Sequence, residues 1–426
     1  MKKFGIIILT LLISYSFASA QEVPLTLDEA VAIALRDNRD ILISAQGIEK
    51  AKAQIKEAWA EIFPALDFST TRLTTQNLRP EPYNTMEIHA GLQQIIFASG
   101  RIINTIQYNE YGRQVQQALL NKTKLETVLS VKEAFCTLIL SAELYKVNYQ
   151  MLENIQQHLD FLRQRYQNGQ ASGSDILNAQ ASLSAVKKEC EGSLNQVEAA
   201  ENLLKKLLYL QESVKIKASG EFIYEPLEIV YDKAILEAMS RRPEIKQYEA
   251  QAKADQKAVN VARTGNLPSI YATWDEYSGD KFLTATGGSN KWKNYNVYGF
   301  TFSWPIFDGL ATQARIEQAI VGLKETKLTQ EKTIKDIALE VKNSYLSLKD
   351  AIAKIEASEA DLKFYSDNLS TVKEKYTEGI TSILDVSDAN LKYALSAFNK
   401  QQALYDYIVA KSAFEKATGG TYASAK

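Results

Sequence analysis

The spacing of apolar residues predicts long helices over most of this chain. A helix is predicted from residue 99 to 168, and in its later part apolar side chains recur at steps of three and four, which places them along one helix face, as in a coiled coil. One stretch of this apolar seam consists of Leu152, Ile155, Leu159, Leu162 and Tyr166. A continuous helix of this length would be about 105 Å long, far longer than the helices of ordinary globular domains. A return helix is predicted to follow, from about Ser174 to Leu210.

Two shorter regions change to a period of two, which predicts β-hairpins at 66–94 and 269–304. In the first hairpin, the residues that share the apolar face are Met86, Ile88, Ala90 and Leu92. The polar residues between them share the other face. In the second hairpin, the corresponding apolar face carries Tyr298, Phe300 and Phe302. Each predicted hairpin therefore has one apolar and one polar face.

The chain contains an internal repeat of about 200 residues. The apolar seam reappears 210 residues later as Leu362, Tyr365, Leu369, Val372 and Tyr376. Nearer the start of each copy the offset is 204 residues, which relates Ala30 to Ala234 and Pro64 to Pro268. A period of this length indicates a duplicated half of a protein rather than a short solenoid unit. The two repeats are predicted to cover 21–225 and 226–426.

Both repeats are predicted to have the same order of elements. In the first, a helix begins at the Thr26–Glu29 capping box and runs to about Ile62. The hairpin 66–94, long helices over 99–210 and a linking segment at 211–225 follow. In the second, a helix interrupted at Pro243 precedes the hairpin 269–304, long helices over 306–416 and a C-terminal tail. The predicted fold class is mainly α, with long antiparallel coiled-coil helices and two β-hairpins.

The N-terminus has the features of a secretory signal peptide over residues 1–20. Lys2 and Lys3 precede an apolar run, and Ala18-Ser19-Ala20 has the small-x-small form of a cleavage site. The alternative is a membrane anchor. The apolar run is only about 14 residues long, whereas a spanning helix needs about 20, so we expect cleavage after Ala20 and export.

Composition narrows the function further. The formal net charge is -2, which is unlike that of a general nucleic-acid binder. Two cysteines exclude a disulfide scaffold and a four-cysteine zinc site, and two isolated histidines argue against a histidine-based metalloenzyme. The sequence contains no Walker A or GxSxG motif. We therefore expect no enzyme activity, no cofactor and no bound metal.

Two pairs of repeated motifs carry a family resemblance. Gln93-Gln94-Ile95-Ile96-Phe97-Ala98-Ser99-Gly100 and Trp304-Pro305-Ile306-Phe307-Asp308-Gly309 follow the two hairpins. A Tyr-x-x-Gly…Asp motif stands at each turn between the long helices, at 166–175 and 376–385. In these motifs and in the repeated helix–hairpin–long-helix order, the chain resembles the TolC-like outer-membrane efflux proteins over essentially the whole mature sequence.

This resemblance implies a homotrimer in the outer membrane of a Gram-negative bacterium. Each protomer would contribute four strands to one shared transmembrane barrel, and its long helices would form a periplasmic tunnel. The trimer would be the passive exit duct of a tripartite efflux or type I secretion system. It would dock to a periplasmic adaptor and an inner-membrane transporter, with no nucleic acid among its partners. The alternative is an exported coiled-coil adaptor without a pore.

The resemblance also assigns roles at the two turns between long helices. In the family these turns shape the tunnel entrance and meet the adaptor, and here they contain Tyr166, Gly169, Ser172, Tyr376, Gly379, Thr381 and Ser382. Thr381 stands where relatives often have a basic residue, so a gating salt bridge of that kind cannot form there. Glycine also simply ends helices, and both tyrosines continue the apolar seam, so core packing is an alternative for them.

Three acidic residues are candidates for a pore constriction. Asp385 and Asp388 match the family's acidic ring, and three copies would place six carboxylates around a narrow pore, which favours cations. Asp175 is the third candidate, and Asn178 stands at the position equivalent to Asp388. Helix capping is the alternative for Asp175 and Asp385, because each follows a serine at a spacing of three.

Three tryptophans lie in or beside the second hairpin, namely Trp274, Trp292 and Trp304. The shared barrel implied by the resemblance would use them as an interfacial aromatic girdle. Packing in an ordinary soluble sheet is the alternative.

Overall fold

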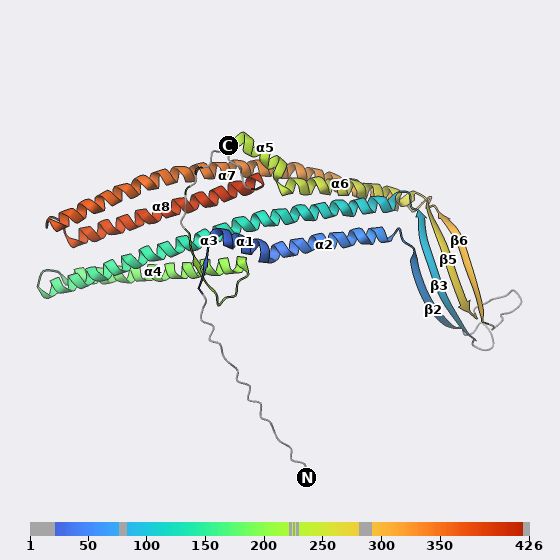
Figure 1. The fold of residues 1–426 in the computed structure, drawn as a ribbon, viewed down its shortest axis with the longest axis horizontal. Coiled ribbons are helices and arrows are strands. Elements are labelled where there is room, and N and C mark those ends of the chain that lie inside the picture. The colour runs from blue at the N-terminus through green and yellow to red at the C-terminus, as the bar shows by residue number, and fades with distance from the viewer. Residues whose placement is uncertain are drawn as a thin grey trace, which may run out of the picture. The chain divides into compact units, whose positions relative to one another are not determined.

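The computed structural model describes residues 22–75, 83–220, 224, 226, 230–280 and 292–420 (Figure 1). The predicted signal peptide lies outside these residues. None of the helices in the described ranges is both long enough and apolar enough to cross a membrane.

The first repeat consists of β1 (Glu22–Leu25), α1 (Leu27–Asp37), α2 (Arg39–Ala60), β2 (Ala65–Thr75), β3 (Tyr83–Phe97), α3 (Arg101–Gln167), α4 (Gly173–Leu208) and β4 (Lys215–Ala218). The second consists of α5 (Tyr231–Arg241), α6 (Pro243–Arg263), a 3-10 turn (Thr264–Asn266), β5 (Ser269–Gly279), β6 (Lys293–Ser303), α7 (Ala311–Thr377) and α8 (Ile383–Thr418). The predicted fold class, with its long helices and two hairpins, is confirmed.

The long helices have matched lengths in the two repeats. Both α3 and α7 have 67 residues, and both α4 and α8 have 36 residues. At 1.5 Å per residue, each of the longer helices extends for about 100 Å. The turns between them therefore fall at equivalent places in the two copies, 210 residues apart.

The first predicted helix is not continuous, and this corrects the expectation of one helix to about Ile62. The backbone leaves the helical region at Asn38, where ψ is 127°. The side chain of Asn38 is buried, and its Nδ2 donates to the carbonyl of Leu207 at 3.1 Å. Arg242 breaks the second repeat in the same way, with ψ of 126°, just before Pro243. The two breaks are 204 residues apart, so they are a property of the repeat.

The described residues divide into two compact units, and the first comprises 1–38, 127–226 and 347–412. Its core brings α1, α3 and α4 together through Phe135, Leu204 and Leu208, none more than 2% exposed. Full burial of such side chains contributes about 1.5–3 kcal/mol each. Ala30 and Ala34 keep α1 close to the longer helices because they have no bulk beyond Cβ. The parallel pair β1–β4 covers this core with Ile216 and Ala218.

The second unit comprises 39–126, 227–346 and 413–426 and contains the sheet. Its strand order is β2-β3-β5-β6, and all neighbours are antiparallel. One register row consists of Leu66, Leu92, Trp274 and Tyr298, and the next consists of Asp67, Gly91, Asp275 and Val297. Adjacent rows point to opposite faces, so the predicted apolar and polar faces are present. The apolar face is open, with Phe68 72% and Phe300 80% exposed.

The motif after each hairpin forms a sharp turn into a long helix. Ser99 and Gly100 have φ of 50° and 82°, and their equivalents Gly309 and Leu310 both have φ of 69°. These left-handed conformations favour glycine, which explains one glycine in each motif. Asp308 then caps α7, since its carboxylate accepts from the backbone N–H of Thr312 at 2.9 Å.

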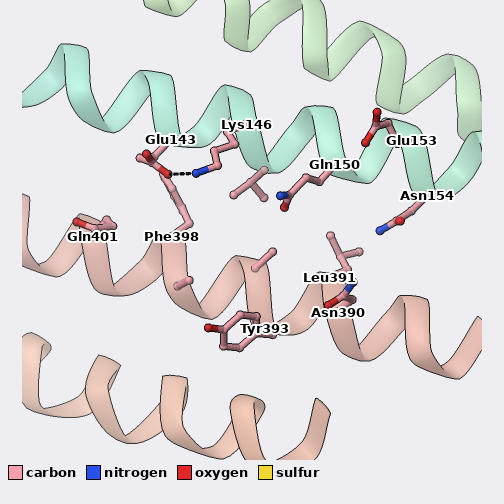
Figure 2. A pocket seen from close by; sticks show the side chains of 13 residues that line it. Glu143, Lys146, Gln150, Glu153, Asn154, Asn390, Leu391, Tyr393, Phe398 and Gln401 are labelled. Carbon is pink, nitrogen blue, oxygen red and sulfur yellow. Dashed lines mark ion pairs between the residues drawn. The ribbon is translucent and has the colours of Figure 1, made fainter. Parts of the chain in front are cut away.

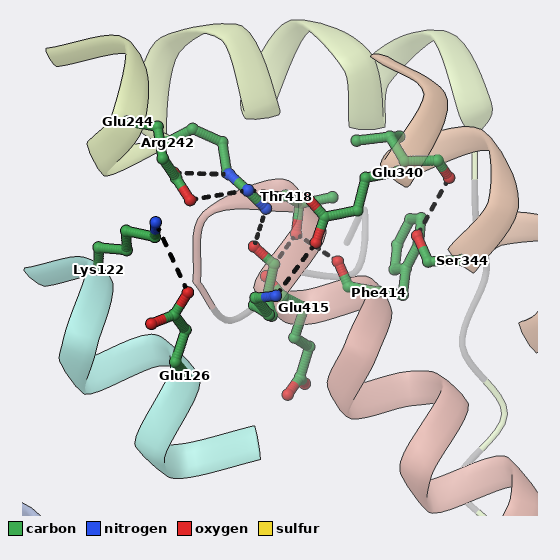
Figure 3. Close-up of polar contacts among 11 residues, drawn as sticks. Lys122, Glu126, Arg242, Glu244, Glu340, Ser344, Phe414, Glu415 and Thr418 are labelled. Carbon is green, nitrogen blue, oxygen red and sulfur yellow. Dashed lines mark hydrogen bonds and ion pairs between the residues drawn. The ribbon is translucent and has the colours of Figure 1, made fainter. Parts of the chain in front are cut away.

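A partly buried ion network joins the α5–α6 break to the end of α8 within the second unit (Figure 3). The guanidinium of Arg242, whose side chain is 4% exposed, donates to Glu244 at 2.9 Å and to Glu340 at 2.8 Å. It also donates to the carbonyl of Lys416 at 3.0 Å, and the ammonium of Lys416 pairs with Glu340 at 3.3 Å. The C-terminal end of α8 is thereby fixed to α7 and to the start of α6.

Candidate functional site

The two turns between long helices have the same backbone construction. Gly169 and Gly379 adopt left-handed φ values of 70° and 77°. In each turn the glycine N–H donates to the tyrosine carbonyl three residues earlier at 3.0 Å, and the next N–H donates five residues back at 2.8 Å. This is the Schellman pattern that ends helices at glycine. A Cβ at either glycine would meet nothing within 4 Å, so the backbone conformation, and not packing, requires glycine.

The return helices α4 and α8 both begin with a reciprocal cap. The carboxylate of Asp175 accepts from the backbone N–H and the hydroxyl of Ser172 at 2.9 and 2.7 Å. Asp385 accepts from Ser382 in the same way, at 2.8 and 2.7 Å. These hydrogen bonds, those from the serine hydroxyls first, lower the pKa of both carboxyl groups. Both aspartates are therefore capping residues and remain charged at neutral pH.

The structure brings residues of both turns together in the first unit. A hollow of about 490 Å³ is lined by the last turns of α3 and by Tyr376 and Ser382 from the second turn. The guanidinium of Arg165 lies 5.5 Å above the ring of Phe161 beside it. The two tyrosines that continue the apolar seam are not core residues, because Tyr166 is 51% and Tyr376 44% exposed. Their rings are available to another molecule.

Asp388 lies one turn beyond the cap and has a different environment. Its carboxylate is exposed and pairs with the ammonium of Lys392 at 2.8 Å. Sequence reasoning missed Lys392, although a spacing of four on a helix is the usual signal for an ion pair. Thr381 donates from its hydroxyl to the carbonyl of Val372 at 3.4 Å, so it stabilises the turn and offers no charge.

A second hollow lies between α3 and α8 in the same unit (Figure 2). Its volume is about 480 Å³, and sequence reasoning did not find it. Glu143, Lys146 and Glu153 contribute charged groups from α3, whereas Tyr393 and Phe398 contribute aromatic rings from α8. Glu143 and Lys146 form an ion pair at 3.7 Å. This groove is open and of mixed polarity, which suits a charged, elongated partner better than a small apolar ligand.

The three tryptophans occupy different positions on the sheet. Trp292 and Trp304 flank the two ends of β6, and their indole N–H groups donate to Ser278 and to the carbonyl of Asn266. Trp274 instead stands in the middle of β5, opposite Leu92 and Tyr298. It is therefore part of the apolar face and not of a strand end.

Within the described residues, no group of three or more His, Cys, Asp or Glu side chains could hold a metal ion. The two cysteines, Cys136 and Cys190, are free and buried. Of the three candidate acids, Asp175 and Asp385 cap helices and Asp388 forms an ion pair.

Comparison with known proteins gives a consistent family. The family described as "Outer membrane efflux protein" matches residues 30–208 and 234–420, one segment in each repeat. The chain is 24% identical over 382 residues to the probable outer membrane lipoprotein SilC of Salmonella typhimurium, covering 88% of this chain and 80% of the relative. It is 22% identical over 395 residues to the outer membrane protein TolC of Escherichia coli strain K12, covering 90% and 80%.

Solved structures have the same fold. The outer membrane channel CmeC of Campylobacter jejuni superposes with a TM-score of 0.79 at 18% identity, covering all of this chain and 95% of the other. The open state of the Neisseria gonorrhoeae MtrE outer membrane channel gives a TM-score of 0.75 at 17% identity, covering 95% and 93%. These relatives are outer-membrane proteins and channels, and they give no support to the alternative of a pore-less adaptor.

Proposed function

This chain belongs to the outer membrane efflux protein family, and from that premise we propose that three copies of it form one exit duct. The duct spans the outer membrane through a shared barrel and continues into the periplasm as a helical tunnel. It serves a tripartite efflux or type I secretion system through a periplasmic adaptor and an inner-membrane transporter. The transporter supplies the energy, so this chain conducts cargo passively and carries out no catalytic step.

The sheet with two open edges is the observation that carries this proposal. In the described sheet β2 and β6 are the outer strands, each 11 residues long and each paired on one side. Open edges of this length favour pairing with another chain. Because the four strands alternate in direction, β6 of one copy can pair antiparallel with β2 of the next. Three copies then close a barrel of twelve strands, above the minimum of about eight for such barrels.

The dimensions of the sheet agree with a membrane-spanning role. Eleven residues at about 3.4 Å each give a strand of about 37 Å, and a tilt of about 45° reduces its height to about 26 Å, close to the apolar band of such barrels. Trp292 and Trp304 flank β6 at its two ends, where aromatic girdles meet the lipid headgroups. We assign the girdle to these two residues and place Trp274 within the apolar band.

The turns between the long helices are the proposed docking end. Exposed Tyr166 and Tyr376, together with the hollow that the two turns share, form a surface for the adaptor. The groove between α3 and α8 extends this surface along the helices. Asp388, with Asp385 one turn before it, contributes to an acidic ring around the pore, and Asp175 acts as the cap of the first turn.

The first experiment is the mass of the detergent-extracted protein from separated outer membranes, measured by light scattering. We expect a trimer, because the open strand edges need partners. A soluble periplasmic monomer would contradict the shared barrel and would mean that the sheet packs against its own chain.

Docking is tested with Gly169→Asn and Gly379→Asn. Asparagine tolerates the left-handed conformation, and a Cβ at either position meets nothing within 4 Å, so the turn should keep its shape while gaining a side chain. We expect normal trimers with reduced adaptor-dependent export, measured as substrate accumulation in cells. The matched control is Gly192→Asn on α4, far along the helix from the turn. Normal export with both turn variants would contradict docking at these turns.

A further inference from the structure

We propose that Lys392 sets the ion selectivity of the tunnel entrance by halving the negative charge that the acidic ring presents. This inference rests on the proposed function, because it requires three copies of Asp388 around one pore. It goes beyond that function in naming a basic residue that limits the affinity of the entrance for multivalent cations.

Three charged residues share one face of α8. Asp385, Asp388 and Lys392 follow one another at spacings of three and four, which places their side chains along a single line on the helix. The ammonium of Lys392 lies 2.8 Å from the carboxylate of Asp388. Each copy therefore presents one net negative charge on this face instead of two. Three copies present three negative charges instead of six.

Because the Asp388–Lys392 ion pair is exposed, it affects the pore through its summed charge and not through its contribution to folding stability. The side chain of Asp388 is 61% exposed and that of Lys392 is 52% exposed. An exposed pair of this kind contributes little to folding stability. Its summed charge, however, still acts on an ion that passes at a separation near the Debye length.

The internal repeat provides a comparison within the same chain. The return helices α4 and α8 are both 36 residues long, so Asn178 and Ser182 stand at the positions of Asp388 and Lys392. The Ser182 hydroxyl donates to the carbonyl of Asn178 at 3.0 Å, and neither residue is charged. The second repeat thus has one additional acid and one additional base at adjacent turns. On this face of the return helix, Lys392 restores the net charge found in the first repeat, where Asp175 is the single acid.

The consequence concerns the class of ions that the entrance retains. Six unopposed carboxylates would bind a multivalent cation, and the bound cation would block the pore. With Lys392 present, the ring keeps a weaker preference for cations and releases multivalent ions more readily.

The test uses purified trimers in planar lipid bilayers. The reversal potential in a KCl gradient reports cation selectivity, and titration with hexaamminecobalt(III) reports block by a trivalent cation. We expect Lys392→Gln to increase cation selectivity and to tighten the block roughly tenfold, because three added negative charges act on a trivalent ion through screened water. Lys392→Arg should behave as the unmodified protein, since it retains the charge.

Two further variants separate the possible causes. Asp388→Asn should weaken both selectivity and block, and Asp388→Asn combined with Lys392→Gln should return both toward the unmodified values. Lys400→Gln is the matched control, because it removes the same charge from α8 two turns away, where Lys400 pairs with Glu359 at 3.2 Å. It should have little effect.

The outcomes distinguish this inference from the proposed function. Altered selectivity in Asp388→Asn with no change in Lys392→Gln would overturn the role of Lys392 and leave the acidic ring intact. An equal effect of Lys400→Gln and Lys392→Gln would also overturn it, since the whole tunnel would then act alike. No change in either Asp388→Asn or Lys392→Gln would contradict the acidic ring itself, and the inference with it.

Discussion

Cys136 illustrates how position on a long helix determines the chemistry of a residue. Its thiol is fully buried in α3, and burial raises its pKa to about 12. Thiolate is the reactive form of cysteine. At pH 8 only about one thiol in ten thousand would be ionised, so burial opposes modification twice, by limiting access and by limiting ionisation.

We therefore predict that Cys136 in the native protein resists alkylation by iodoacetamide between pH 7 and 9. The measurement is mass spectrometry of a Cys190→Ser variant, so that only one thiol is counted. The same sample in denaturant should be labelled completely and serves as the control. Rapid labelling of the native protein would mean that α3 opens around Cys136.

Asn38 shows what sequence analysis of single residues cannot reach. The helical pattern through Asn38 is unbroken, and the break depends on a hydrogen bond to Leu207, which is 169 residues away. The equivalent break at Arg242 could be predicted because the next residue, Pro243, disfavours a helical conformation at Arg242. Lys392 is different, because its spacing of four from Asp388 already indicated an ion pair, and the structure shows that the two side chains form it. Local patterns gave the turns and their caps, whereas contacts between distant elements required coordinates.

At the scale of elements, the Arg242 network determines how the ends of three helices are held together. Burial would raise the pKa of Glu340, but the charges and hydrogen bonds of Arg242 and Lys416 outweigh it and lower the pKa below the ordinary 4.5. A carboxyl group whose pKa is lowered by folding stabilises the protein above its unfolded pKa. That contribution is lost as the pH falls through the folded pKa.

We predict that the thermal stability of the protein falls below about pH 4.5 and that Glu340→Gln reduces this acid sensitivity. The comparison is made by circular dichroism melts at pH 7 and at pH 3.5. At pH 7, Arg242→Met should lower the free energy of unfolding by about 3 kcal/mol, the lower end of the cost of breaking a buried ion pair. We choose the lower end because Glu340 is 35% exposed and keeps Lys416. A pH profile unchanged by Glu340→Gln would contradict this role.

The element order itself was largely predictable, for physical reasons. A period of two and a period of 3.6 differ enough to separate hairpins from helices in a chain with so few prolines. The internal repeat supported this assignment, because the same elements are predicted at equivalent positions in both copies. The strand order β2-β3-β5-β6 was not accessible, because the paired residues of β3 and β5 lie between 173 and 192 positions apart in the sequence. The two hollows were also missed, since each is formed by residues of α3 together with residues from the second repeat.

At the scale of the whole molecule, the open edges of the sheet predict that β2 of one copy pairs with β6 of another. Within one chain, β2 and β6 are separated by three strand spacings, or about 14 Å, which is too far for a disulfide. A disulfide between these strands must therefore join two copies.

The experiment places Ser69→Cys in β2 together with Val297→Cys, Gly299→Cys or Thr301→Cys in β6, in a chain without Cys136 and Cys190. After oxidation in the membrane, we expect dimers and trimers on a non-reducing gel for at least one of the three pairs. Ser69→Cys alone should give none. Failure of all three pairs would contradict pairing of β2 with β6 of a neighbour.

The equal lengths of α3 with α7, and of α4 with α8, have a consequence for how this protein can change. The lengths of the four long helices depend on one another, because residues of both turns line one hollow. An insertion in a single helix would shift one turn past its counterpart and break the seam. Lengthening should therefore succeed only as a concerted change of whole heptads in all four helices. The length of the duct in the periplasm can therefore change only by whole heptads, each of which adds about 10 Å.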